Sequence, residues 1–353
     1  MRPMSHETIR PVRLLLCGFG RVGRAFARLV HDRAPDLRRA YGLDLRLVGV
    51  ADLGGTAAAT DRSLPVPELI AHFEGGRNLG EFPGLGRPGW SGREAIEGIA
   101  ADVFVETTPT NITDGEPATT HLKLALGRGL HAASANKGPF LRHHAELKAV
   151  ARASGVALKL SAATAAALPT LDVGLTCLAG ARVLGFEGIL NGTTNYILTR
   201  MHQADASYAE GLAEAQRLGI AETNPALDVE GRDTANKVLV IANEVMEAGL
   251  APEAVAVTGI TGVTPADVRA AHAAGRVLKL IGRATAEPAG VRARVAPEAL
   301  AADHPLAHVH GSEKAITFLT DTMDRVTVSG GKSDPRGAAA ALLKDILNIY
   351  RGA

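Results

Sequence analysis

The stretch VRLLLCGFGRVGRAFARLV, residues 12–30, combines three local patterns in an order that decides the fold. Its apolar run, Val12 to Cys17, predicts a buried strand. Glycines follow directly at positions 18, 20 and 23, and apolar residues then recur at helical spacing, at Val22, Phe26, Leu29 and Val30. Strand, glycine-rich turn and helix in this order predict the first unit of a parallel, doubly wound sheet.

Later segments repeat the alternation of strand and helix. LDLRLVGVAD (43–52) and ADVFVETTPT (101–110) predict further buried strands, and residues 118–138 predict a helix followed by a short strand. We therefore expect an α/β protein with an N-terminal Rossmann-like domain, a doubly wound parallel sheet, over residues 1–160. Residues 74–93 are dense in Gly and Pro and predict an irregular connection.

The pattern changes beyond about residue 160. Long helical periodicities cover residues 195–219 and 233–249, and strand-like segments follow at 291–297, 314–321 and 325–331. This mixture predicts an α+β second domain over residues 161–332. The segment 334–350 then predicts a closing helix with Pro335 near its start.

Size and charge narrow the class of protein. A chain of 353 residues exceeds the usual size of one core, so two domains are expected. The 38 basic and 37 acidic residues give a net charge of +1, which favours neither nucleic acid nor a membrane surface as a partner. Only two cysteines and no apolar signal segment are typical of a cytoplasmic protein. Pro169 and Asp172 interrupt the longest apolar-leaning stretch, so no membrane span is expected.

The three glycines have the G-x-G-x-x-G spacing of dinucleotide-binding turns. The first glycine permits a tight turn, the second lets the backbone approach a pyrophosphate, and the helix N-terminus attracts its charge. A site for NAD or NADP is predicted at Gly18, Phe19, Gly20, Arg21, Val22 and Gly23. Asp52 would bind the ribose hydroxyls of NAD, whereas Arg21 or Arg62 would bind the 2′-phosphate of NADP, so the preference stays open.

A second concentration of polar residues is AETNPALDVEGRDTANK, residues 221–237. Four carboxylates precede its closing Lys237, those of Glu222, Asp228, Glu230 and Asp233. A charge run of this kind is most often a solvated surface. Asp233 and Lys237 are four residues apart in a predicted helix, so their side chains share a face.

Two shorter segments contain further candidates. SANKGP (134–139) places Lys137 at the end of a predicted strand, on the edge where parallel sheets bind ligands. NGTTN (191–195) lies between apolar segments and fits either a hairpin turn or an N-capped loop whose hydroxyls face a polar ligand. An ordinary turn remains the alternative for both.

Five blocks resemble the homoserine dehydrogenase family, in the family's order and over nearly the whole chain. They are ASANKGP (133–139), GILNGTTNYILTRM (188–201), AETNPALDVEGRDTANK (221–237), GRVLKLIG (275–282) and TFLTDTMDRVTVSGG (317–331). Such enzymes interconvert L-aspartate 4-semialdehyde and L-homoserine with NAD(P), a step toward threonine and methionine. This reaction needs a proton donor at the carbonyl oxygen and an anion for the substrate ammonium, and block 221–237 contains both.

The resemblance implies a role for each matching residue. Lys237 matches the catalytic acid/base lysine, Lys137 matches the lysine beside nicotinamide and substrate, and Asp233 would orient the Lys237 amine. The implied substrate-binding residues are Glu222, Asp228, Asp233, Asn191 and Thr193. The cofactor contacts implied in addition to the glycine turn and Asp52 are Thr108, Lys137 and Gly331.

The resemblance also implies how the domains are used. The first domain would be completed by the helix within 333–353, and the second would divide into a catalytic part (about 173–301) and dimerisation parts (about 161–172 and 302–332). A homodimer is therefore expected. Because the chain stops after the closing helix, we expect no C-terminal regulatory domain and no allosteric threonine site.

The segment LSAATAAALPT, residues 160–170, departs from the family pattern: Ser161 replaces an acid, and alanines replace glycines. In relatives, backbone carbonyls of this loop bind a monovalent cation, Na⁺ or K⁺. The corresponding carbonyls here belong to Thr164, Ala166 and Leu168.

Two rival interpretations fit less well. A non-catalytic NAD(P)-sensing or scaffold protein on the same fold would not need the two lysines or Glu222. An aspartate-semialdehyde dehydrogenase would need a catalytic cysteine. Cys17 precedes the glycine turn and Cys177 lies in an apolar run, so neither is well placed for that role.

Overall fold

The computed structural model describes residues 9–60, 62–331 and 334–351. Contacts between residues divide the chain into two compact units, one formed by residues 1–163 with 334–353 and the other by residues 164–333. The first unit is therefore discontinuous in sequence. Within the described ranges, no helix is both long and apolar enough to cross a bilayer.

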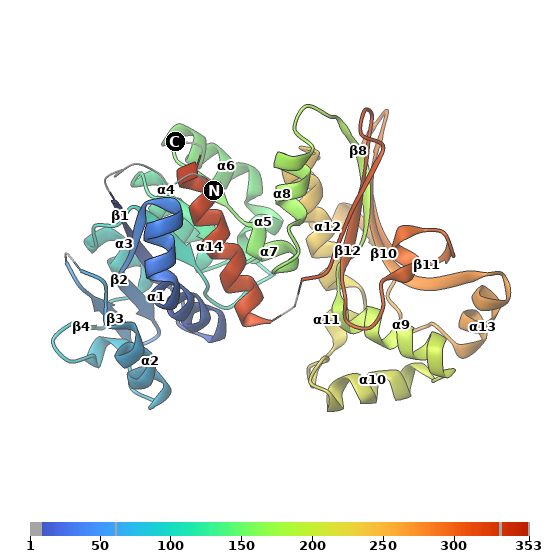
Figure 1. Ribbon diagram of the computed structural model, residues 1–353, viewed down its shortest axis with the longest axis horizontal. Helices are drawn as coiled ribbons and strands as arrows, with labels where there is room; N and C mark the ends of the chain where they lie inside the picture. Colours follow the sequence, from blue (N-terminus) through green and yellow to red (C-terminus); the bar gives the residue numbers. More distant parts are fainter. Residues whose placement is uncertain (1–8, 61, 332–333, 352–353) are drawn as a thin grey trace. The chain divides into compact units, whose positions relative to one another are not determined.

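Unit 1 is built on a sheet whose described strands lie in the order β4-β3-β2-β1-β5-β6-β7 (Figure 1). Five strands pair in parallel: β1 (Arg10–Cys17), β2 (Leu43–Asp52), β5 (Val103–Glu106), β6 (His131–Ser134) and β7 (Leu158–Lys159). β3 (Gly55–Ala58) and β4 (Gly86–Pro88) extend the β2 edge by antiparallel pairing. This sheet confirms the α/β class predicted from the first strand, turn and helix.

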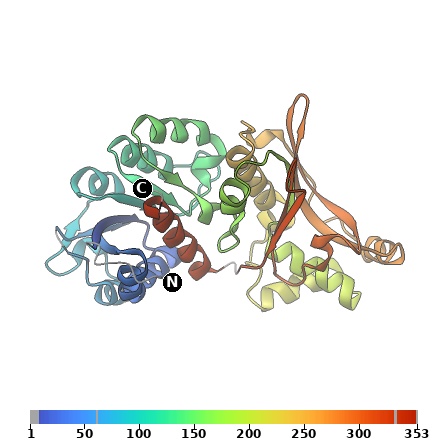
Figure 2. The same ribbon diagram turned by 45° about the horizontal axis from the view of Figure 1, so that its top comes forward.

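The helices of unit 1 connect these strands, except the C-terminal helix, which returns to the unit after residues 164–333. They are α1 (Arg21–Tyr41), α2 (Val66–Glu74), α3 (Gly92–Gly98), α4 (Ala118–Gly127), α5 (Gly138–Arg142), α6 (His144–Ala153) and α14 (Pro335–Arg351). α14 packs beside α1, from the opposite end of the chain (Figures 1 and 2). Ala339, Leu342 and Ile346 enter the same buried cluster as Phe26 and Val30.

The connection at residues 74–93 is more ordered than its composition predicts. It contains the 3₁₀ turn Leu79–Glu81 and the strand β4, and Ser91 caps α3 in a capping box with Glu94. The glycines make this compact path possible: a Cβ on Gly80 would lie 2.8 Å from the Pro88 Cα. High Gly content here therefore indicates close backbone approach rather than lack of structure.

The strand order of unit 1 changes direction at β1, with β2 on one side and β5 on the other. Ligands of open parallel sheets bind at such a switch point, beyond the carboxyl ends of the strands. The glycine turn follows β1 and Thr107 follows β5 at this edge. The topology thus brings two polar segments together that are separated by about 90 residues.

Unit 2 contains a six-stranded sheet of order β13-β12-β8-β10-β11-β9 among its described residues. The strands are β8 (Val183–Ile189), β9 (Val255–Val257), β10 (Arg276–Glu287), β11 (Gly290–Ala301), β12 (Ala315–Thr320) and β13 (Arg325–Ser329). Pairing is antiparallel except between β9 and β11. The mixture with helices confirms the predicted α+β character.

The α-helices of unit 2 are α8 (Thr170–Asp172), α9 (Gly192–Ala204), α10 (Tyr208–Arg217), α11 (Ala226–Val229), α12 (Arg232–Val245) and α13 (Pro265–Ala273). The short α7 (Ser161–Ala165) lies where the two units join in sequence. α12 packs on β10 and β11. A Cβ on Gly282 would lie 2.5 Å from a methyl of Val238, so the missing side chain lets α12 approach the sheet. This contact fixes the helix that carries Asp233 and Lys237.

Candidate active site

The glycine turn after β1 is closed on one side and open on the other. Gly18 has φ +89°, and a Cβ there would lie 2.5 Å from the Thr107 carbonyl carbon. A Cβ on Gly23 would collide with the Gly18 carbonyl, whereas a Cβ on Gly20 would meet no described atom within 4 Å. The first and third glycines are thus required by packing, and the second leaves space in which a pyrophosphate would meet bare backbone.

Asp52 lies beside this turn at the end of β2. Its carboxylate accepts hydrogen bonds from the Phe19 amide and, at 2.6 Å, from the Leu53 amide. The acid therefore holds the glycine turn against the second strand, at the position from which acids of this fold bind ribose hydroxyls. Arg21 is exposed in the same turn.

Arg62 lies far from that position. The Leu64 amide donates to the Leu47 carbonyl, so this segment runs beside the middle of β2. Leu47 is five residues before Asp52, a distance of roughly 16 Å along a strand. Of the two arginines considered for a 2′-phosphate, Arg21 is the one at the glycine turn.

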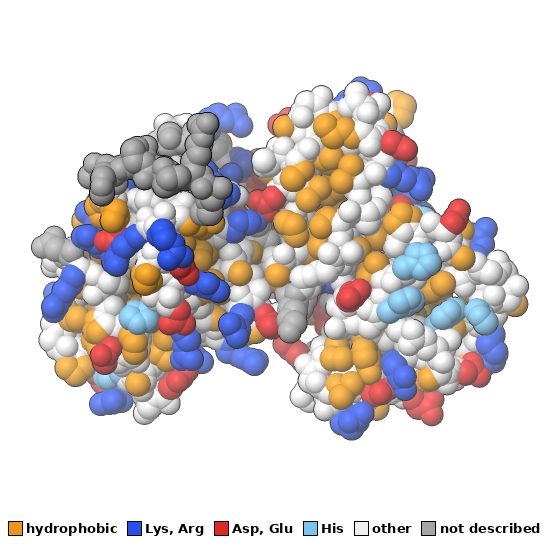
Figure 3. Space-filling model, in the orientation of Figure 1, with side chains coloured by type: hydrophobic (Ala, Val, Ile, Leu, Met, Phe, Trp, Pro, Cys, Tyr) orange, Lys and Arg blue, Asp and Glu red, His pale blue; other side chains and the backbone are white. Residues whose placement is uncertain are grey.

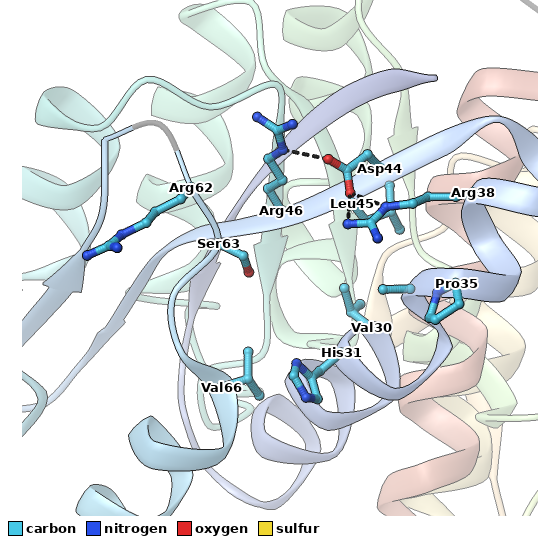
Figure 4. A pocket seen from close by; sticks show the side chains of 11 residues that line it. Val30, His31, Pro35, Arg38, Asp44, Leu45, Arg46, Arg62, Ser63 and Val66 are labelled. Atoms are coloured by element: carbon cyan, nitrogen blue, oxygen red, sulfur yellow. Dashed lines mark hydrogen bonds and ion pairs between the residues drawn. The ribbon is translucent and has the colours of Figure 1, made fainter. Parts of the chain in front are cut away.

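A cavity of about 570 Å³ lies near Arg62, at the other end of β2 (Figure 4). Asp44 lies at its wall and pairs with Arg38 at 2.6 Å and with Arg46 at 2.6 Å. Burial opposes ionisation of Asp44, but hydrogen bonds and charge attraction from the two arginines outweigh it and lower the pKa of Asp44. Because the cavity lies at the amino end of β2, it is not the predicted cofactor site, which lies at the carboxyl ends of the strands.

Glu106, a residue that sequence reasoning missed, organises the end of β5. Its buried carboxylate accepts from the Thr108 amide at 2.7 Å and the Thr108 hydroxyl at 2.5 Å, and lies 3.1 Å from His121 Nδ1. Burial raises the pKa of the Cys17 thiol, and the carboxylates of Glu106 and Asp52 raise it further. A thiol held protonated is a poor nucleophile, which argues against Cys17 as a catalytic nucleophile.

Asn136 links Thr108 to Lys137. Its Nδ2 donates to the Thr108 carbonyl at 3.1 Å and to the Pro109 carbonyl at 3.2 Å, and its Oδ1 accepts from the Gly138 amide at 3.0 Å. Lys137 lies between these anchored residues, directly before α5. The asparagine in the motif SANKG was the sequence signal for this arrangement.

Unit 2 brings four of the predicted residues into one hydrogen-bonded network. Asn191 Nδ2 donates to Asp228 Oδ1 at 2.7 Å and to Asp233 Oδ2 at 2.9 Å. Asp233 Oδ2 also accepts from Lys237 Nζ at 2.6 Å. The side chains of Asp233 and Lys237 are only 13% and 15% exposed, so their ion pair is largely shielded from water.

The ammonium of Lys237 has a defined direction. One N–H donates to Asp233 and a second donates to the Leu190 carbonyl at 2.8 Å. A lysine ammonium has three donors, and the third meets no acceptor among the described residues of the chain. Two acceptors thus fix the position of the Lys237 ammonium, and its third N–H is available to a substrate.

Asn191 decides between the two interpretations of the NGTTN segment. It is the N-cap of α9, where its Oδ1 accepts from the Thr194 amide at 3.0 Å. The segment is therefore an N-capped helix start and not a hairpin turn. Thr193 donates to the Ile220 carbonyl at 3.1 Å and ties α9 to the segment that precedes Glu222.

Other predicted residues lie outside this network. The Glu222 side chain is exposed, and no described residue bonds its carboxylate. Glu230 pairs with Arg232 at 3.1 Å, and both are well exposed, as expected of surface charges. A Cβ on Gly331 would lie 2.6 Å from the Leu168 amide nitrogen, so Gly331 packs on the 164–168 loop.

The 164–168 loop does not fit a metal cation well. The Ala165 carbonyl accepts from Lys314 Nζ at 2.6 Å, and the Leu168 carbonyl accepts from the Thr170 amide at 2.8 Å. A cation on the neighbouring carbonyl of Ala166 would lie within roughly 9 Å of the ammonium. Like charges at that distance repel by about 2 kcal/mol at an effective dielectric constant of about 20.

A dinucleotide-type glycine turn and a shielded, directed lysine are features of NAD(P)-dependent oxidoreductases. The sequence profile of homoserine dehydrogenase matches residues 169–347. The NAD(+)-dependent homoserine dehydrogenase of Pseudomonas canavaninivorans is 38% identical over 342 residues, 97% of each chain. The chain belongs to the homoserine dehydrogenase family.

Further relatives have the same name. The homoserine dehydrogenase of Methanocaldococcus jannaschii is 35% identical and is covered over 98% of its length, with 96% of this chain matched. The solved homoserine dehydrogenase of Thiobacillus denitrificans has a TM-score of 0.82 at 27% identity, over 97% of this chain and 74% of that one. The family and fold expected from the five sequence blocks are confirmed.

Proposed function

We propose that this chain interconverts L-aspartate 4-semialdehyde and L-homoserine with NAD or NADP, and that Lys237 is its acid/base. The observation that carries the proposal is the Lys237 ammonium, held by Asp233 and the Leu190 carbonyl with one donor left over. A bound cofactor would supply or accept the hydride. Reduction of the aldehyde leaves an alkoxide, and a proton directed at that oxygen lowers the barrier.

The carboxylates around Lys237 would bind the amino-acid part of the substrate. The exposed Glu222 carboxylate is available to pair with the substrate ammonium, and Asp228 would contribute a second negative charge. Asn191 and Thr193 would shape this pocket through their bonds to Asp228 and to the Ile220 carbonyl. Glu222 is the test residue, because its carboxylate has no structural partner among the described residues.

The cofactor would bind at the switch point of unit 1. Support comes from the open space at Gly20, the turn residues Gly18 to Gly23, and Asp52 beside them. Thr108 and Lys137, joined through Asn136, would contact the nicotinamide half, and Gly331 is proposed as a further contact. We accordingly propose unit 1 as the cofactor-binding domain and residues of about 173–301 as the catalytic part.

We further propose that two copies associate through unit 2. Figure 3 shows apolar side chains gathered over α8 and the strands β8 and β12. Leu319 is 39% exposed, Met323 is 46% exposed and Leu175 is 47% exposed, and β13 is an edge strand of the sheet. Exposed large apolar side chains beside a free strand edge are typical of a surface that a partner covers. Sedimentation velocity would show a dimer; a monomer at micromolar concentration would contradict this.

We place the protein in the cytoplasm. Cys17 and Cys177 are free thiols, and free thiols are typical of reducing compartments. Fractionation of cells that produce the chain would test this location.

Initial rates of homoserine oxidation with NAD and with NADP test the function. Lys237→Ala should lower kcat about 10²- to 10⁴-fold and leave cofactor affinity unchanged, because the ammonium acts on the substrate oxygen. Lys123→Ala is a matched control, since Lys123 forms an ion pair with Glu146 at 2.7 Å in unit 1 and touches none of the proposed site residues. Cofactor binding without turnover in the unaltered chain would favour the sensing or scaffold alternative.

A further inference from the structure

Lys314 is a buried lysine that the proposed reaction does not use. Its side chain is 1% exposed, and its Nζ donates to the Ala165 carbonyl at 2.6 Å. It directly precedes β12, and its own carbonyl accepts from the Gly330 amide at 2.9 Å. A buried ammonium is costly unless it is well bonded, so the partner at the loop is part of what keeps it there.

The loop that receives this ammonium has an unusual backbone. Ala166 has φ +53°, a left-handed conformation that non-glycine residues seldom adopt. Gly331 packs against Leu168, and the Thr164 and Thr170 hydroxyls lie 2.8 Å apart across the loop. The path of residues 164–170 is therefore fixed on several sides, and the Ala165 carbonyl within it points at the Lys314 ammonium.

An ammonium and a monovalent metal ion meet the same need at such a loop. Each is a single positive charge that carbonyl oxygens can surround, so one can stand in for the other. The difference is that Lys314 is covalently attached to the strand beside the loop. Its presence at the loop therefore does not depend on the concentration of any ion in solution, and its positive charge repels a second cation.

We propose that the Lys314 ammonium is a built-in cation of the 164–168 loop, and that this chain needs neither Na⁺ nor K⁺ there. The proposal concerns the stability of unit 2 and does not depend on the assignment of substrate. It replaces the expectation that carbonyls of Thr164, Ala166 and Leu168 bind a metal ion.

Thermal unfolding in three chloride salts at equal ionic strength tests the proposal. The salts are those of Na⁺, K⁺ and tetramethylammonium, which is too large to enter a carbonyl loop. The unaltered chain should have the same Tm in all three. Lys314→Met should have a lower Tm in tetramethylammonium and regain part of the loss in Na⁺ or K⁺, along a saturating curve.

Lys279→Met is the matched control. Lys279 is equally buried at 1% exposure, but its ammonium binds Asn195 Oδ1 at 3.0 Å and the Val309 carbonyl, far along the chain from the 164–168 loop. Its Tm should fall without any rescue by Na⁺ or K⁺. Equal rescue of both variants would mean that salts act on the whole protein and would overturn the proposal.

A second measurement keeps the test decisive if Lys314→Met does not fold. The ²³Na resonance of a NaCl solution broadens when Na⁺ exchanges with a protein site and narrows again when K⁺ displaces it. We expect no saturable broadening with the unaltered chain. Broadening that K⁺ reverses, or a Tm that rises specifically with Na⁺ or K⁺, would show that the loop binds a metal ion and that Lys314 does not replace it.

Discussion

Replacing Asn191 with Ala should damage both stability and turnover, since this one side chain both caps a helix and bridges two carboxylates. Its Oδ1 caps α9 through the Thr194 amide, and its Nδ2 bridges Asp228 and Asp233. Loss of an N-cap costs about 1 kcal/mol. A hydrogen bond to a charged acceptor contributes about 1.5–3 kcal/mol where the acceptor stays dry. Because Asp228 and Asp233 are both only partly buried, each can regain some water, and we expect a total loss of about 3 kcal/mol.

Urea denaturation of Asn191→Ala and Ser207→Ala separates these contributions. Ser207 caps α10, with its hydroxyl accepting from the Glu210 amide at 3.3 Å, and it has no contact with the carboxylate cluster. Its loss should therefore cost only the capping term of about 1 kcal/mol. The kcat of Asn191→Ala should also fall about 10²-fold, since Asp233 would no longer hold Lys237 in place.

Asn191→Asp isolates the bridge from the cap. The carboxylate keeps an oxygen for the Thr194 amide, but it places a third negative charge against Asp228 and Asp233. Its stability should therefore improve as the pH is lowered toward the protonation range of the three carboxyls, unlike that of Asn191→Ala. If Asn191→Ala loses no more stability than Ser207→Ala and retains its kcat, Asn191 does not organise the site.

Three further outcomes are expected. Glu222→Gln should raise KM for homoserine at least tenfold with little change in the Kd of NAD, because it removes a proposed ammonium partner; equal losses in both would indicate a structural role. Asp52→Asn should raise the affinity for NADP relative to NAD, since a carboxylate repels a 2′-phosphate; titration with both cofactors, with Arg21→Ala as the opposite change, checks this, and an unaltered ratio would contradict it. Burial lowers the pKa of Lys279 from 10.5 to about 8, so between these values the unfolded chain binds the extra proton and stability rises with pH. Between pH 8 and 10 the free energy of unfolding of the unaltered chain, measured in urea, should rise by about 2 kcal/mol relative to that of Lys279→Met. If the two free energies change in parallel with pH, the assignment is refuted.

Local patterns predicted the elements of this chain better than the contacts between them. The strand, turn and helix at residues 12–30 and the i, i+4 pair of Asp233 and Lys237 follow from spacing within one element. Periodicity acts over a few residues, and those residues were sufficient for the fold class.

The missed residues depend on partners far away in sequence. Lys314 stands in GSEKA (311–315), which has the composition of a solvated loop, and only the carbonyl of Ala165, 149 residues earlier, explains its burial. Glu106 stands at the end of a short strand, and its partner His121 comes from the following helix. The spacing of residues within one segment cannot predict contacts with residues of another segment. The chemistry of a site can therefore be recognised by resemblance before its supporting contacts can be derived.

The discontinuity of unit 1 has a consequence for synthesis on the ribosome. Residues 164–333 are contiguous, so unit 2 can fold while the chain is still being made. Unit 1 emerges first but lacks α14, whose Ala339, Leu342 and Ile346 fill part of the cluster that contains Phe26 and Val30. The part of unit 1 that contains Phe26 and Val30 therefore keeps an apolar surface uncovered until α14 has left the exit tunnel and can pack on α1.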